Sequence, residues 1–85
     1  MNILDFKLFL AESAYTPKEV LDILAKDKSW YVRASVAKNP KLPKEILEFL
    51  AKDEDPDIRE SVAKNPKTTK EILEILEKDK DYYIR

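Results

Sequence analysis

Apolar residues recur in three segments of the chain with one spacing, i, i+1, i+3 and i+4. This spacing puts them on one side of an α-helix, in a stripe wide enough to contact several neighbouring helices. We therefore predict three amphipathic helices. Their apolar positions are Val20, Leu21, Ile23 and Leu24; Ile46, Leu47, Phe49 and Leu50; and Ile72, Leu73, Ile75 and Leu76.

The residues before these stripes indicate where the helices begin. Thr16 precedes Pro17 and Glu19, which predicts a capping hydroxyl, a proline at the first helical position and a glutamate that completes a capping box. The segment from Thr68 repeats this pattern. Leu42 occupies the same place in the middle segment and has no hydroxyl, so we expect a weaker helix start there.

A second, narrower pattern follows each of the first two stripes. Ser29, Asp55 and Asp81 are good N-caps in equivalent places, and Asn-Pro at residues 39–40 and 65–66 stops the helix because the residue before proline avoids helical backbone angles. We predict short second helices, of α or 3₁₀ type. Their inward faces comprise Val32, Ser35 and Val36, and Ile58, Ser61 and Val62.

These patterns belong to a repeat of 26 residues. PKEVLDILAKDKSWYVRASVAKNPKL (17–42) and PKEILEFLAKDEDPDIRESVAKNPKT (43–68) are identical at 16 of 26 positions, and residues 69–85 match 43–59 at 11 of 17. The sequence predicts a single domain over 1–85. It contains a degenerate N-terminal cap half-repeat (1–15), repeat 1 (16–41), repeat 2 (42–67) and a truncated repeat 3 (68–85).

Helix pairs repeated at a fixed offset bury a continuous core by stacking, so we expect an all-α fold, a right-handed α/α superhelix (solenoid) of two-helix repeats. The apolar start of the chain, around Ile3, Phe6 and Phe9, would be the N-terminal cap helix. Lys7 is its one cation, which disfavours a membrane-surface helix. The start lacks the features of a signal peptide and no segment is long enough to span a bilayer, so we expect a cytoplasmic protein.

Composition removes several classes of function. The chain has no Gly, Cys or His, which excludes phosphate-binding glycine loops, disulfides, Cys/His zinc sites, thiol nucleophiles and imidazole bases. Its net charge of −1 gives no overall attraction to nucleic acid. We expect no catalytic residues, no metal and no cofactor, and hence no enzyme.

Residues 32–53, VRASVAKNPKLPKEILEFLAKD, and residues 58–79, IRESVAKNPKTTKEILEILEKD, resemble the leucine-rich repeat variant family, with its V-R-x-x-V-A-x-N-P pattern. The run from Asp53 to Arg59 is also similar to HEAT repeats, in the wider HEAT and armadillo group. The resemblance implies an alternating-helix superhelix that binds or scaffolds proteins. Some members carry an iron–sulfur cluster on cysteines, which this chain lacks.

Aspartate and arginine recur six residues apart, as Asp27 and Arg33, Asp53 and Arg59, and Asp79 and Arg85. These arginines either bind an acidic partner or form a structural ladder in which each aspartate holds a turn and pairs with an arginine of its own or the next repeat. We favour the structural ladder because the spacing follows the repeat.

Lysines gather in the turns between repeats and would line one edge of a superhelix. Such a basic edge could follow a phosphate backbone, but glutamates lie among the lysines and no aromatic residue alternates with them, so a solvated edge is the preferred interpretation. The lysines are Lys38, Lys41, Lys44, Lys64, Lys67 and Lys70.

Aromatic pairs occupy the start of the second helix, as Trp30-Tyr31 and Tyr82-Tyr83. Trp30 and Ala34 lie roughly opposite Val32 and Val36 on the helical wheel, and aromatic residues placed there either anchor a partner or pack against a neighbouring helix pair. The acidic run around Asp53, Glu54 and Asp57 is explained by capping and helix-start charge rather than by a metal site.

These observations together predict a non-enzymatic module that binds a protein partner through the inner-helix face. The sequence ends where the second helix of repeat 3 would begin, so we expect Leu73 and Leu76 to lack cover. We expect this C-terminal end to bind the partner or to form a homo-oligomer. The alternative function is weak nucleic-acid or phosphate binding along the lysine edge.

Overall fold

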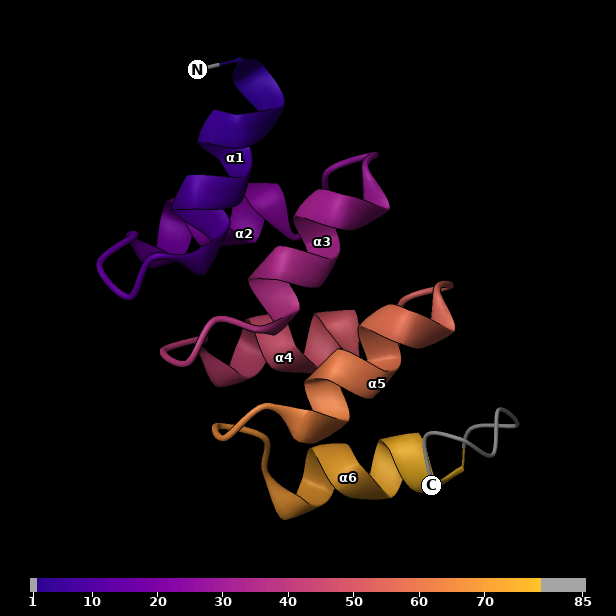
Figure 1. Cartoon of the computed structure of the whole chain (residues 1–85). Helices are drawn as coiled ribbons and strands as arrows, with labels where there is room; N and C mark the ends of the chain where they lie inside the picture. The colour runs from indigo at the N-terminus through magenta and orange to yellow at the C-terminus, as the bar shows by residue number, and fades with distance from the viewer. Residues whose placement is uncertain (1, 79–85) are drawn as a thin grey trace.

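The computed structural model describes residues 2–78, which form six α-helices and no strand (Figure 1). The all-α prediction is confirmed for this part of the chain. The second helices α3 and α5 are α-helices, as long as or longer than the helices before them. The helices are α1 (Ile3–Glu12), α2 (Lys18–Leu24), α3 (Trp30–Ala37), α4 (Lys44–Leu50), α5 (Pro56–Lys64) and α6 (Lys70–Glu77).

The helices form two layers. Figure 1 shows α1, α3 and α5 following one another along the molecule, with α2, α4 and α6 beside them. Contacts join α3 to α1, α2, α4 and α5, so α3 lies at the centre of the stack. Helices α2, α4 and α6 begin at Lys18, Lys44 and Lys70, and α3 and α5 begin at Trp30 and Pro56. Equivalent helices of successive repeats thus begin 26 residues apart.

The core runs between the two layers and is built from one face of each helix. Leu47, Val32 and Ile58 at its centre are fully buried, as the apolar spacing predicted. The stripe on α2, α4 and α6 is narrower than expected, however. Ile23, Phe49 and Ile75, at equivalent positions, are 70%, 48% and 36% exposed because they lie at the border between the core-facing and solvent-facing sides of their helices.

Two buried asparagines tie each helix pair to the preceding one. Asn65 Nδ2 donates to the carbonyls of Ala37 (2.7 Å) and Asn39 (3.0 Å), and its Oδ1 accepts from the Lys67 N–H. Asn39 makes the same set of bonds one repeat earlier, to Ala11 and Ser13, with Lys41 as its donor. The sequence predicted only that Asn-Pro stops the helix, so these contacts between repeats are a finding of the structure.

The helix starts differ in part from the prediction. Thr16 does not cap α2; its hydroxyl donates to the Leu10 carbonyl instead, and α2 begins after Pro17 with no side-chain cap. Helix α4 likewise begins after Pro43 without a cap, so the two starts are equivalent. Helix α6 is capped by Thr69, which has a hydroxyl at the N-cap position where α2 and α4 have proline. Thr68 donates to the Val62 carbonyl, as Thr16 does to Leu10.

The two ends of the described stack expose apolar side chains to different extents. Helix α1 packs against α2 and α3, yet Ile3, Phe6 and Phe9 are 75%, 52% and 61% exposed, so its outer side is not the polar surface that a cap helix presents. At the other end Leu73 is 45% exposed, whereas Leu76 is buried, contrary to the expectation that both lack cover. No helix in residues 2–78 has the length and apolar character needed to cross a membrane.

Candidate functional site

The most distinctive exposed feature at the start of α3 is an aromatic pair. The rings of Trp30 and Tyr31 stack with centroids 3.9 Å apart and an interplanar angle of 24°. They remain 46% and 55% exposed. Both residues lie in the first turn of α3, directly after the N-cap Ser29. The pair thus presents an apolar surface to solvent.

The other residues predicted to lie with this pair are placed differently. Ala34 is half-buried and packs against the core, so it contributes little to an exposed face. Helix α3 has neighbours on most of its circumference, which accounts for the burial of Ala34. Tyr82 and Tyr83 lie outside the described residues.

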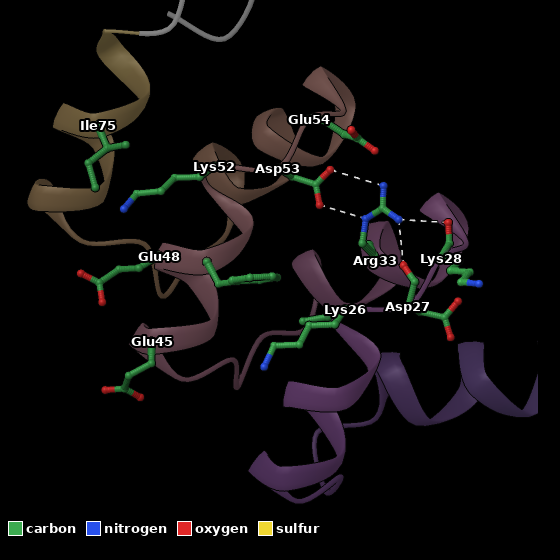
Figure 2. A pocket seen from close by; sticks show the side chains of 12 residues that line it. Lys26, Asp27, Lys28, Arg33, Glu45, Glu48, Lys52, Asp53, Glu54 and Ile75 are labelled. Atoms are coloured by element: carbon green, nitrogen blue, oxygen red, sulfur yellow. Dashed lines mark hydrogen bonds and ion pairs between the residues drawn. The ribbon is translucent and has the colours of Figure 1, made fainter.

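The aspartates and the cations contact one another across successive repeats, and Figure 2 shows the pair of Arg33 and Asp53. Arg33 reaches Asp53 of the next repeat through Nε–Oδ2 (2.9 Å) and Nη2–Oδ1 (3.4 Å), and both side chains are largely buried. Lys7, at the position equivalent to Arg33, reaches Asp27 at 2.8 Å in the same manner. A cation of one repeat thus pairs with the aspartate of the next.

Each aspartate also holds its own turn. Asp27 Oδ1 accepts from the Ser29 N–H (2.8 Å), and Asp53 Oδ1 accepts from the Asp55 N–H (3.0 Å). The arginine six residues later donates to the aspartate's backbone carbonyl, Arg33 to Asp27 and Arg59 to Asp53. These bonds give Asp27, Asp53 and Arg33 contacts both within their own turn and with a neighbouring repeat, and they give Arg59 a contact within its own turn. Asp79 and Arg85 lie outside the described residues.

The contacts of Asp27 lower the pKa of its carboxyl. The hydrogen bond from Lys7 Nζ lowers the pKa of the Asp27 carboxyl below its ordinary value of 3.8, and the Ser29 N–H lowers it further. Burial opposes this effect. The carboxylate is therefore held in its charged form, which suits an ion pair between repeats rather than acid–base chemistry at neutral pH.

A hollow of about 880 Å³ opens between α2 and α4 and extends to α6 (Figure 2). Phe49 and Ile75 supply its apolar surface, and Lys26 Nζ lies 5.8 Å from the centroid of the Phe49 ring. Lysines and carboxylates both surround it, including Lys52 and Glu48. This hollow was not predicted, because the apolar spacing places Phe49 and Ile75 on the core-facing stripes of α4 and α6. Their position at the edge of the apolar stripe was the available signal.

The lysines of the predicted basic edge all have exposed positions in the structure. Those in the turns after α3 and α5 lie on the same side of the molecule, where Figure 1 shows these two turns. Lys64 is 3.5 Å from Glu60 on its own helix. The exposed edge exists, but glutamates accompany its lysines: Glu60 pairs with Lys64, and Glu45 and Glu71 follow Lys44 and Lys70 in the sequence.

The acidic run at the start of α5 is used within the fold. Asp55 caps α5 by accepting from the Asp57 N–H at 2.9 Å, and Asp53 is bound to Arg33. Within residues 2–78 no three His, Cys, Asp or Glu side chains are arranged to hold a metal ion. No family model, curated protein or solved structure matches this chain.

Proposed function

We propose that the chain is a helical-repeat solenoid of the leucine-rich repeat variant type and that it acts as a non-enzymatic protein-interaction module. The 26-residue offset between helix starts supports the solenoid, together with the asparagine and cation–aspartate contacts that recur at the same offset. Such stacks present long surfaces to partners. A right-handed superhelix is the form that the family resemblance implies.

The observation that carries the proposed function is the exposed Trp30–Tyr31 stack. Large aromatic side chains dominate the binding energy of many interfaces, and a stacked pair loses little conformational freedom on binding. The pair stands on α3, the helix with the most neighbours, so its backbone is well supported. We propose that a protein partner binds here, with the exposed Leu73 at the C-terminal end as a second, smaller contact.

A pull-down from the native cell, read by mass spectrometry, tests this site with the full chain as bait. We expect Trp30→Ala to abolish or strongly reduce capture of the main partner, since truncation of a central aromatic anchor costs about 2 kcal/mol or more. Tyr15→Ala is the matched control, because Tyr15 is 94% exposed and lies in the turn after α1. Equal capture by both variants would refute the site.

The exposed lysine edge favours a second candidate, weak binding to nucleic acid or another polyphosphate. Its distinguishing property is salt dependence, because contacts to phosphates release counterions. Replacement of Lys41, Lys44, Lys67 and Lys70 by glutamate would then abolish binding to a nucleic acid while Trp30→Ala leaves it unchanged. Binding that resists salt and is lost only with Trp30→Ala supports the protein-interaction proposal.

A further inference from the structure

The contacts of α1, α3 and α5 fix which of their positions are equivalent. Lys7 reaches the aspartate 20 residues later in the chain, and Arg33 does the same one repeat on. Arg33 and Arg59 each donate to the backbone carbonyl six residues earlier. Lys7, Arg33 and Arg59 therefore hold the same position on three helices. Helix α3 lies between the other two, since it contacts both α1 and α5.

This arrangement places a carboxylate on either side of the Trp30–Tyr31 stack. Asp5, Tyr31 and Asp57 each precede the cation of their helix by two residues. Axes of packed helices lie about 8–10 Å apart, so each aspartate is about one helix spacing from Tyr31. Both aspartates are exposed, and within residues 2–78 neither side chain forms an ion pair.

The nearest cations leave this surface negative. Lys28 is exposed two residues before Trp30, but Glu54, also exposed, holds the equivalent position one repeat later and balances its charge. Lys38 lies seven residues beyond Tyr31, about 10 Å along the helix axis. The aromatic stack and the two flanking aspartates thus form an aromatic surface with an excess of negative charge.

Such a surface is complementary to a planar cation. Aromatic rings attract cations over their faces, and the arginine guanidinium both stacks on rings and donates to carboxylates. We propose that the protein partner binds through a basic segment that crosses α1, α3 and α5, with an arginine against the Trp30–Tyr31 stack and further basic side chains facing Asp5 and Asp57. This inference rests on the proposed function, because it names the chemistry of the partner at the same site.

The fluorescence of Trp30, the single tryptophan of the sequence, tests the proposal with the full chain. The probes are short peptides of serine and alanine with arginine, lysine or citrulline at every third position, because three extended residues span about 10 Å, one helix spacing. Citrulline is planar like arginine but uncharged. We expect the arginine peptide to change the Trp30 emission and to bind at least about tenfold more tightly than the citrulline peptide, with the lysine peptide between them. Equal affinity for arginine and citrulline, or no saturable change in emission, would overturn the proposal.

Double variants test the role of the two aspartates. Asp5→Asn with Asp57→Asn should weaken the arginine peptide about fivefold or more at low salt. Glu19→Gln with Glu71→Gln is the matched control, because it neutralises two exposed carboxylates on α2 and α6 and should leave the affinity unchanged. Circular dichroism checks that the variants are folded. Equal losses in the two double variants would reduce the effect to net charge and contradict the site.

The pull-down described above separates this inference from the proposed function. Loss of the partner with Trp30→Ala and also with the aspartate double variant supports both. Loss with Trp30→Ala alone contradicts the basic segment and leaves the proposed function standing, whereas loss with neither variant refutes both. Sedimentation showing that the Trp30–Tyr31 surface joins two copies of the chain and excludes the arginine peptide would also overturn the inference.

Discussion

Asp27 accepts a hydrogen bond from Lys7 Nζ of the preceding repeat and another from the Ser29 N–H of its own turn. Both favour the carboxylate over the protonated acid, which is why its pKa is lowered. A group whose pKa is lower in the folded state stabilises the fold above its unfolded-state pKa. This contribution is lost as the pH falls through the folded-state pKa, below 3.8.

This linkage predicts a pH-dependent effect of Lys7→Met. The variant should be less stable than the original chain at about pH 7, and the difference should shrink as the pH falls through the lowered folded-state pKa of Asp27, below 3.8. Urea unfolding followed by circular dichroism measures both. Lys18→Met is the control, since Lys18 pairs with the exposed Glu45 at 3.6 Å and should change stability by less than about 0.5 kcal/mol. A Lys7→Met effect that stays constant down to about pH 2.5 would contradict the account.

At the scale of the helix, equivalent positions of the repeat do not contribute equally to helix capping. Asp55 and Ser29 are both N-caps of the second helix in their repeats, with similar extended backbone angles. Asp55 accepts from the Asp57 N–H, while the Ser29 side chain makes no capping bond. The bond that caps α5 is thus missing from α3, which instead begins with the stacked aromatic pair.

We therefore expect unequal costs from removing these two caps. Asp55→Ala should lower the free energy of unfolding by about 1 kcal/mol, and Ser29→Ala by a few tenths at most. Chemical denaturation of the two variants in parallel gives the comparison. If the serine variant lost as much stability as the aspartate variant, Ser29 would have to cap α3 in solution.

At the scale of the whole molecule, stacking depends on polar contacts as well as on apolar burial. Asn39 is fully buried and supplies donors to the Ala11 and Ser13 carbonyls at the end of α1. Those carbonyls belong to the unsatisfied group at a helix C-terminus, which needs partners when it is covered by another helix pair. One side chain thus satisfies two acceptors of its neighbour and one donor of its own turn.

Asn39→Ala should be among the most damaging single substitutions in the chain. We expect a loss of about 2–4 kcal/mol because the carbonyls lose their donor in a site that water reaches poorly. Asn2→Ala removes an exposed asparagine bond, the cap to the Asp5 N–H at 2.7 Å, and should cost only about 1 kcal/mol. Urea unfolding measures both. Similar losses for the two variants would mean that the bonds of Asn39 contribute no more than a surface cap.

The sequence predicted the helices and most of the core because each apolar position recurs at helical spacing in every copy, as with Val32, Ile58 and Leu47. It did not predict the partners of Asn39, since a bond across 26 or 28 residues leaves no local pattern. The exposure of Phe49 was missed for a related reason. A stripe of apolar residues on one helix does not say how closely the neighbouring helices approach, and that distance decides whether its edge is covered.

The repeated aspartate and asparagine contacts that join one helix pair to the next span similar stretches of chain, 20 residues for the aspartates and 26 or 28 for the asparagines. None of them requires the first and last helices to meet. Insertion or deletion of a whole 26-residue unit would therefore leave the contacts on either side intact, whereas a change of a few residues within a unit would break them. These contacts do not fix the number of 26-residue units. Such a protein could therefore gain or lose whole units during evolution without changes to its core.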